Sequence, residues 1–194
     1  MRLSYTQLNT YYTCPYRYYL QYFENIPTDE TEALRFGKRF HEKILEVDEE
    51  DEQIMKMQEA LWANEEFKKF KNIQLEVMDT ERIGGYNYYM RHDGIDGDTI
   101  LEFKSAIREW KEEDFNNLIQ PYLAMKIRGG RFVYFIVTKH KKPRVQVREI
   151  KFEEKEWDRL ANLSESIMKD FTYKRNKAQH CYFCPFQKHC DAWF

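Results

Sequence analysis

The stretch RHDGIDGDTILEFKSA, residues 91–106, contains the pattern that decides the fold of this chain. The turn signal DGD at 96–98 folds the strand before it back on the strand after it, so that Asp93 lies about level with Glu102. Glu102 and Lys104 are two positions apart, and in a strand they point to the same face. Two acids and a lysine therefore converge on one place in the predicted hairpin.

Two interpretations of this hairpin are open. Its charged groups suit a hard divalent cation with an ammonium group beside it. Alternatively, the hairpin is solvated and its charged residues simply alternate outward. Ile100, Leu101 and Phe103 favour the first interpretation, because they make the second strand apolar enough to be central, where a charged pair is costly without a use.

The sequence around the hairpin predicts a sheet between helical ends. Segments rich in β-branched and aromatic residues predict strands at IQLEVMDTERI (73–83), GYNYYMRHDGI (85–95), TILEFKSAI (99–107), RFVYFIVTK (131–139) and RVQVREIKF (144–152). Helices are predicted from Ser4 to a turn at Cys14-Pro15, from Pro15 onward, and over about 31–48, 53–71, 112–128 and 153–173. This order predicts an α/β fold with a central mixed β-sheet flanked by helices.

Composition limits the classes of function. The 194 residues are 42% hydrophobic, which is enough for a single domain over residues 1–194 with its own core. Thirty-one basic and 33 acidic residues give a formal charge of -2, so any nucleic-acid surface must be local. The sequence has no apolar run long enough for a bilayer and no signal-peptide pattern, which predicts a cytoplasmic protein without a membrane partner.

Three of the four cysteines lie in the stretch HCYFCPFQKHC (180–190), and the fourth is Cys14. In a reducing compartment such cysteines are more often metal ligands than disulfides, and the first two of the stretch have C-x2-C spacing. Four thiolates bind zinc or an iron–sulfur cluster, and spacing alone does not choose between them. A zinc site of three cysteines with His180 or His189 is the alternative.

The spacing of the acid and the EFK tripeptide in the hairpin resembles the D…(D/E)-x-K signature of the PD-(D/E)XK nuclease superfamily. FGKRFHEKI (36–44) is similar to the G-x3-H helix of its RecB-like branch, and QPYLAM (120–125) lies where that branch has a Q-x3-Y motif. YYTCPYRYYLQY and CYFCPFQKHC are similar to the split cysteine cluster of the AddB nuclease domain and the CRISPR-associated RecB-like exonucleases. The resemblance spans residues 4–190 and implies a restriction-endonuclease-like core.

This resemblance implies a set of catalytic residues around one or two divalent cations. The ligands of Mg²⁺ or Mn²⁺ would be His41, Asp93, Glu102 and the main-chain carbonyl of Phe103. Lys104 would orient or help deprotonate the attacking water and offset the charge that develops on the phosphate.

For three further residues, both a function in the site and an alternative without one are open. Gln120 corresponds to the glutamine of the Q-x3-Y motif, but Tyr122 follows it too early and Pro121 is expected to distort the helix. His41 lies on a helical stripe beside an apolar face, where a packed core histidine is the alternative. Glu76 is either a further acid of the site or an outward strand residue.

The resemblance also implies a 4Fe-4S cluster with four ligands: Cys14, Cys181, Cys184 and Cys190. Cys14 would then be the ligand from the opposite end of the chain. The cluster would join the two ends, about 1–25 and 174–194, and stabilise the fold by closing a long loop.

DNA contacts are predicted in two places. The loop KHKKPR (139–144) is the densest basic run and supplies Lys139, Lys141, Lys142 and Arg144. Arg17 lies among tyrosines of the N-terminal region, on which bases could stack. The alternatives are a plain solvated turn for the loop and core packing for the tyrosines.

The implied function is a metal-dependent DNA nuclease, an exonuclease on single-stranded DNA or DNA ends. It would act in DNA recombination or repair, CRISPR adaptation or viral DNA processing, with DNA and recombination or CRISPR-adaptation proteins as partners. The alternative is a non-catalytic module that keeps the fold and the cluster in order to bind DNA or a partner. The nuclease is favoured, because a scaffold needs none of the charged site residues.

Overall fold

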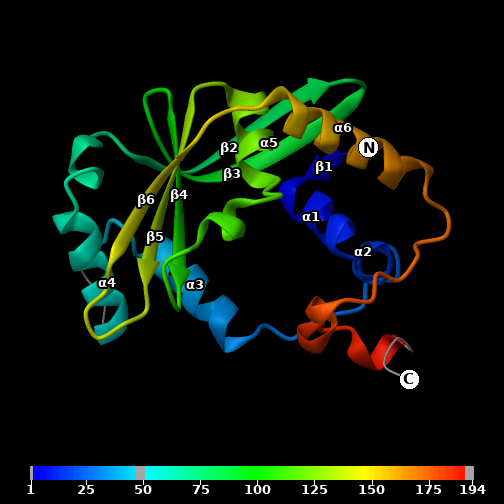
Figure 1. The fold of residues 1–194 in the computed structure, drawn as a ribbon, viewed down its shortest axis with the longest axis horizontal. Helices are drawn as coiled ribbons and strands as arrows, with labels where there is room; N and C mark the ends of the chain where they lie inside the picture. The colour runs from blue at the N-terminus through cyan, green and yellow to red at the C-terminus, as the bar shows by residue number, and fades with distance from the viewer. Residues whose placement is uncertain (1, 47–50, 191–194) are drawn as a thin grey trace.

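The computed structural model describes residues 2–46 and 51–190. Its strands are β1 (Arg2–Ser4), β2 (Gln74–Ile83), β3 (Tyr86–Asp96), β4 (Thr99–Ala106), β5 (Arg131–Thr138) and β6 (Val145–Ile150). Its α-helices are α1 (Tyr5–Thr13), α2 (Pro15–Tyr22), α3 (Glu32–Glu42), α4 (Glu52–Ala63), α5 (Gln120–Arg128) and α6 (Glu154–Lys169) (Figure 1). Short 3-10 helices are η1 (Phe67–Lys69), η2 (Glu112–Phe115), η3 (Gln179–Phe183) and η4 (Gln187–His189).

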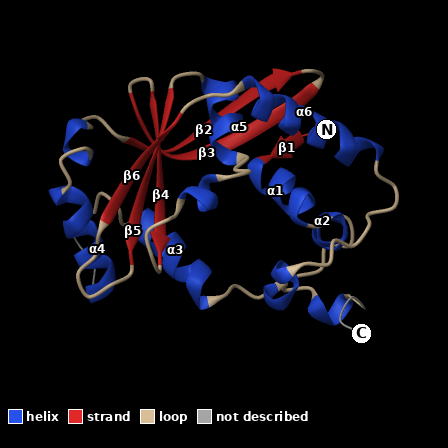
Figure 2. Cartoon of the chain, viewed as in Figure 1, coloured by secondary structure: helices blue, strands red, loops and turns tan. Residues whose placement is uncertain are grey.

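A mixed sheet lies at the centre, with helices on both faces (Figure 2). The strand order is β1-β3-β4-β5-β6, and β2 pairs with β3. β3 and β4 are antiparallel with Gly94 opposite Leu101, and Gly97 adopts a φ of 60° in the turn between them. β4 and β5 are parallel, whereas β5 and β6 are antiparallel. The predicted hairpin and the predicted mixed sheet are confirmed.

One edge of β3 has two different neighbours. Because β2 pairs with β3 along almost its whole length, β1 and β4 share the opposite edge. β1 pairs in parallel with residues 87–89, and β4 pairs with residues 94–96. Residues 90–93 lie between these partners, where the β2–β3 hairpin diverges from β4–β6 (Figure 1). Asp93 therefore lies at an opening in the sheet.

Apolar side chains fill both faces of the sheet. On one face the odd-numbered residues of β4 and β5 pack under α3 and α4, in a cluster of Phe40, Ile44, Ile54, Met57, Leu61, Phe67, Leu101, Phe103, Val133, Phe135 and Val137. On the other face Ile100, Phe132 and Ile136 pack with residues of α1, α5 and α6. Since strand side chains alternate, Glu102 shares the face of Ile100 and points toward the α1 and α5 side.

The predicted helix over 112–128 is wrong in its first half. η2 ends at Phe115, and α5 begins only at Gln120. Pro121 lies in the first turn of α5, where its missing N–H costs no intrahelical hydrogen bond. The proline therefore begins the helix instead of distorting it.

Other helices begin as predicted but end earlier. α4 ends at Ala63, and the side chain of Asn64 accepts hydrogen bonds from the next turn, which divides the predicted 53–71 segment. α3 ends at Glu42, and the last part of the predicted 31–48 helix, residues 47–48, lies outside the described residues. Strand β1 had no sequence signal, because it is only three residues long.

The two ends of the described chain lie side by side. The Tyr11 hydroxyl in α1 donates to Asp170 Oδ2, at the end of α6, over 2.8 Å. Farther on, the Asn176 side-chain amide donates to the Thr13 carbonyl over 2.9 Å. These contacts hold the segment before Cys14 against the segment that leads to the other cysteines.

Candidate active site

The β3–β4 hairpin places the carboxylate of Asp93 against the main chain of β4. Asp93 Oδ2 accepts the N–H of Phe103 at 3.0 Å. The next residue, Gly94, permits this approach, because a Cβ there would lie only 3.0 Å from Ile73 and 3.3 Å from the Phe103 ring. Asp93 is thereby fixed opposite the middle of the EFK tripeptide.

Glu102 and Lys104 form a contact pair on one face of β4. Their carboxylate and ammonium groups touch directly, and Glu102 is only 1% exposed. The Lys104 side chain keeps 29% of its surface exposed. The solvated-hairpin interpretation is wrong, because β3 and β5 flank β4 and bury its acid.

Burial and mutual charge set the protonation of these groups. Burial raises the pKa of Asp93 and of Glu102, and the positive charge of Lys104 offsets part of each increase. Burial by itself would lower the pKa of Lys104, but the charges of Glu102 and Asp93 outweigh it and the pKa is raised. Lys104 therefore keeps its proton at neutral pH; its function toward an attacking water stays a prediction.

His41 reaches the same place from the last turn of α3. Its Nδ1 lies 3.6 Å from Asp93 Oδ1, and its side chain is 25% exposed. Burial lowers the His41 pKa, and the charge of Lys104 lowers it further, so the imidazole is neutral at pH 7. The structure brings His41 to the acids; its function as a metal ligand stays a prediction.

Gln120 is also brought to the site although its motif departs from the family pattern. It is buried as the first residue of α5, and its side chain favours the ionised form of Glu102 by lowering the pKa. Tyr122 lies away from this contact, beside the ring of Phe152. Only the glutamine of the expected pair therefore faces the acids.

A cavity of about 470 Å³ opens over these residues. Its lining includes His41, Asp93, Glu102 and Lys104, together with three residues of the N-terminal segment: Ser4, Tyr5 and Thr6. Sequence analysis missed these residues. Their only signal is the Ser4–Gln7 capping box, which marks the start of α1 but not a position near the hairpin.

Glu76 lies near the site on β2 in a left-handed conformation with a φ of 56°. The neighbouring pairs Leu75–Gly94 and Val77–His92 place Glu76 opposite Asp93. Its negative charge contributes to the raised pKa of Asp93, but its carboxylate forms an ion pair with Arg91 at 2.8 Å. The structure thus shows an exposed acid beside the site and does not decide between its two interpretations.

The donor set suits a divalent cation. Glu102 Oε2 is buried without a hydrogen-bond partner among the described residues, which leaves one lone-pair-bearing oxygen for a ligand. Within residues 2–46 and 51–190, however, no three acidic, histidine or cysteine side chains are gathered closely enough to hold an ion. Glu102 Oε1 is instead directed to Lys104, and Asp93 Oδ2 to the Phe103 N–H.

The four cysteines line one small pocket between α2 and the C-terminal 3-10 helices. All four are free thiols, and two of them contact Asn176: Cys14 Sγ accepts its N–H, and Cys181 donates to its carbonyl. Burial raises the pKa of Cys184, as do the nearby Cys14 and Cys181. The structure brings the cysteines to one place, but in its described part they do not form a coordinating group.

Arg17, His180 and His189 differ in whether they line the cysteine pocket. Arg17 lines the cysteine pocket and lowers the pKa of Cys184, so the structure does not direct it to an outward DNA surface. Its neighbour Tyr18 is buried, which agrees with core packing of the tyrosines. His180 lines the pocket, whereas His189 is exposed and is not among the lining residues.

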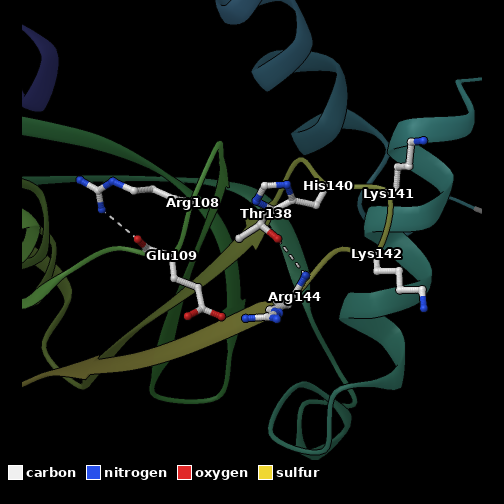
Figure 3. Close-up of a pocket in the computed structure, with 7 residues that line it drawn as sticks. All are labelled: Arg108, Glu109, Thr138, His140, Lys141, Lys142 and Arg144. Carbon is white, nitrogen blue, oxygen red and sulfur yellow. Dashed lines mark hydrogen bonds between the residues drawn. The ribbon is translucent and has the colours of Figure 1, made fainter.

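The basic loop between β5 and β6 borders a groove of about 730 Å³ (Figure 3). Lys141, Lys142 and Arg144 line the groove, and Arg108 and Glu109 form its other wall. Lys139 points elsewhere, with its ammonium group 4.1 Å from the centre of the Phe36 ring.

Comparisons with known proteins agree with this arrangement. Residues 2–114 match the sequence model of the PD-(D/E)XK nuclease superfamily. The crystal structure of the protein SSO0001 has a TM-score of 0.63 and 17% identity, covering 100% of this chain and 87% of its own. A candidate exonuclease from Eubacterium rectale has a TM-score of 0.64 and 15% identity, covering 87% and 80%. At these identities the two structures show the fold alone.

No protein in a search of curated sequences matches the chain. Among the described helices, none combines the length and apolar character that crossing a membrane requires.

Proposed function

The chain belongs to the PD-(D/E)XK nuclease superfamily, and on this premise we propose that it is a metal-dependent deoxyribonuclease that cuts single-stranded DNA or DNA ends. The observation that carries the proposal is the convergence of Asp93, Glu102 and Lys104 on one cavity, with His41 at its side. A module that only binds DNA gains nothing from burying this charged group.

The acids and His41 would hold the cation. Asp93, Glu102 and the carbonyl of Phe103 offer oxygens, and neutral His41 offers a nitrogen, a set that suits Mn²⁺ as well as Mg²⁺. A cation held there supplies positive charge to the scissile phosphate and makes a water molecule more acidic.

Lys104 would position the reactants. Because its raised pKa keeps the ammonium group charged, Lys104 can donate a hydrogen bond to the attacking water or to a phosphate oxygen. Gln120 would hold Glu102 in its ionised form from behind.

A single strand suits this cavity better than a stacked duplex. Glu102 is 1% exposed and the Asp93 side chain is 16% exposed, so a scissile phosphate must enter the opening to approach them. A separated strand or a frayed end can bend into the cavity, whereas base pairing holds a duplex backbone in place.

We propose in addition that the cysteine pocket binds a 4Fe-4S cluster, which would assign the chain to the RecB-like branch. Four free thiols around one pocket form a donor set for such a cluster, and Arg17 offers a nearby positive charge that favours thiolates. Cys14 comes from one end of the chain and the others from the opposite end. The cluster would therefore act as a staple of the fold. A Cys3His zinc site is the competing proposal, with His180 as its histidine because His180 faces the pocket.

The nuclease proposal is tested with end-labelled single-stranded DNA, incubated with the purified chain and Mg²⁺, Mn²⁺ or EDTA. We expect shortened products with either metal and intact DNA with EDTA. Binding of DNA without cleavage under all three conditions would contradict the nuclease and favour the non-catalytic module.

A further inference from the structure

The loop between β5 and β6 carries the densest run of unneutralised positive charge in the described chain. Lys141, Lys142 and Arg144 are exposed, and none of them forms an ion pair with a carboxylate of the described residues. Elsewhere most lysines and arginines face an acid at short range, as in the pairs Lys69–Glu66, Lys155–Glu153 and Lys169–Glu165. Charge repulsion within such a run costs stability unless a polyanion offsets it.

The loop is held in a fixed position. The N–H of Arg144 donates to the Thr138 hydroxyl at 2.9 Å, and the N–H of Thr138 donates to the Arg144 carbonyl at 3.0 Å. The side chain of Gln53 in α4 donates to the His140 carbonyl at 3.2 Å. The cations are therefore presented by an anchored hairpin and not by a free tail.

The β5–β6 loop begins beside the end of β4, the strand that carries Glu102 and Lys104. Thr138 pairs with Ala106, and the N–H of Lys139 donates to the Ala106 carbonyl at 2.7 Å. Ala106 is two residues after Lys104, which is about 7 Å along a strand. A strand of DNA that leaves the cavity past Lys104 thus reaches the groove after a short distance.

The two walls of the groove carry different charge. Figure 3 shows Lys141 and Lys142 along the hairpin, with Arg144 directed toward Glu109 on the opposite wall. Arg108 on that wall is already neutralised by Asp114, through contacts of 2.6 and 3.1 Å. The side of the β5–β6 loop attracts phosphates, whereas Glu109, which has no ion-pair partner among the described residues, repels them.

We propose that this groove binds the phosphodiester backbone of the DNA strand that extends from the active site, with Lys141, Lys142 and Arg144 as the phosphate contacts. The inference rests on the proposed nuclease function for its choice of DNA. In this proposal the β5–β6 loop holds the substrate, and the residues of the active-site cavity carry out the cleavage.

The test measures binding of a labelled single strand of DNA in EDTA, over a series of salt concentrations. The variant Lys141→Ala/Lys142→Ala/Arg144→Ala should bind about tenfold or more weakly, and its slope of log affinity against log salt should be smaller by about 2. The matched control Lys69→Ala/Lys155→Ala/Lys169→Ala removes the same charge from positions outside the groove, and should keep the wild-type slope.

A second variant is expected to change the DNA affinity in the opposite direction. Glu109→Gln removes the acid that faces Arg144 and should tighten binding of the same strand. Tighter binding cannot result from misfolding, so this variant separates the proposal from a general loss of structure.

The outcomes also separate this inference from the nuclease proposal. If the wild-type chain cleaves DNA but the triple variant and its control bind with equal affinity and salt slope, the groove assignment is overturned and the nuclease stands. If no cleavage occurs with any metal but the triple variant alone loses binding, the groove stands and the nuclease falls. Tighter binding of a duplex than of the single strand would overturn the single-strand assignment.

Discussion

Asp93 and Phe103 lie ten positions apart on neighbouring strands, and the carboxylate of Asp93 accepts the N–H of Phe103 at 3.0 Å. This hydrogen bond joins the first acid of the site to the centre of the EFK tripeptide. It spans the place where β3 loses its pairing with β4, so the acid replaces part of the missing strand ladder.

Replacement of Glu102 by Gln should lower cleavage of single-stranded DNA by at least about a hundredfold, because a buried ligand charge is lost. Lys104→Ala should lower it similarly, and should also destabilise the fold by about 1–3 kcal/mol by leaving Glu102 buried without its partner. Cleavage rates and urea unfolding measure the two effects. Wild-type cleavage by either variant would show that the active-site assignment is wrong.

His41→Ala should raise the Mn²⁺ concentration needed for half-maximal cleavage, because the nitrogen ligand proposed beside Asp93 is removed. The measurement is a Mn²⁺ titration at fixed DNA concentration. His189→Ala is a suitable control, since His189 is exposed and lines neither the cavity nor the groove of the basic loop. An unchanged midpoint would restore the interpretation of His41 as a packing residue.

Cys14→Ser should remove iron as completely as Cys184→Ser, because the two thiols line the same pocket from opposite ends of the sequence. Wild-type protein purified without oxygen should be brown and contain about four irons per chain. His180→Ala should keep this iron. A colourless wild type that loses zinc in the His180 variant would replace the iron–sulfur cluster by a zinc site.

Asp170→Asn should weaken the fold at neutral pH. Hydrogen bonds from Thr172, Tyr173 and Tyr11 outweigh the effect of burial and lower the pKa of Asp170 to about 2, so its stabilisation is present above the ordinary value of 3.8 and disappears as pH falls through about 2. After allowance for solvent screening we expect about 1 kcal/mol. Urea unfolding at pH 7 and at successively lower pH should show the two proteins converging. A constant difference down to pH 2 would contradict this origin.

The sequence predicted those parts of the site that lie close together along the chain. The DGD turn and the two-residue period of a strand predict the relation of Asp93, Glu102 and Lys104, which the pairing of Gly94 with Leu101 confirms. Local signals could not predict that Tyr5 faces the same cavity, because β1 is short and its pairing with β3 joins residues about 85 positions apart. A helical pattern alone does not predict the break between η2 and α5, because a proline can either distort a helix or begin one, and Pro121 begins α5.

For the charged residues outside the β3–β4 hairpin, the sequence likewise predicts the local pattern but not the direction of each side chain. Arg17 has tyrosines on both sides in the sequence, a pattern that suggests a DNA contact. In the fold, however, its side chain lines the cysteine pocket. The loop 139–144 was predicted as a basic run, whereas the separation of Lys139 from its neighbours depends on Phe36 of α3. Tertiary packing decides the direction in which a long side chain points. The periodicity of a sequence does not contain this information.

The contact of Asn176 with Thr13 also constrains how the protein is made. The two residues are 163 positions apart, so at about 5–20 residues per second the ribosome needs roughly 8–30 s to deliver the partner of the first segment. During that interval Cys14 is made without the three cysteines that line its pocket in the folded chain. If the four cysteines bind a metal, as proposed above, the complete ligand set exists only late in synthesis, after the β3–β4 hairpin and its buried acids have been made.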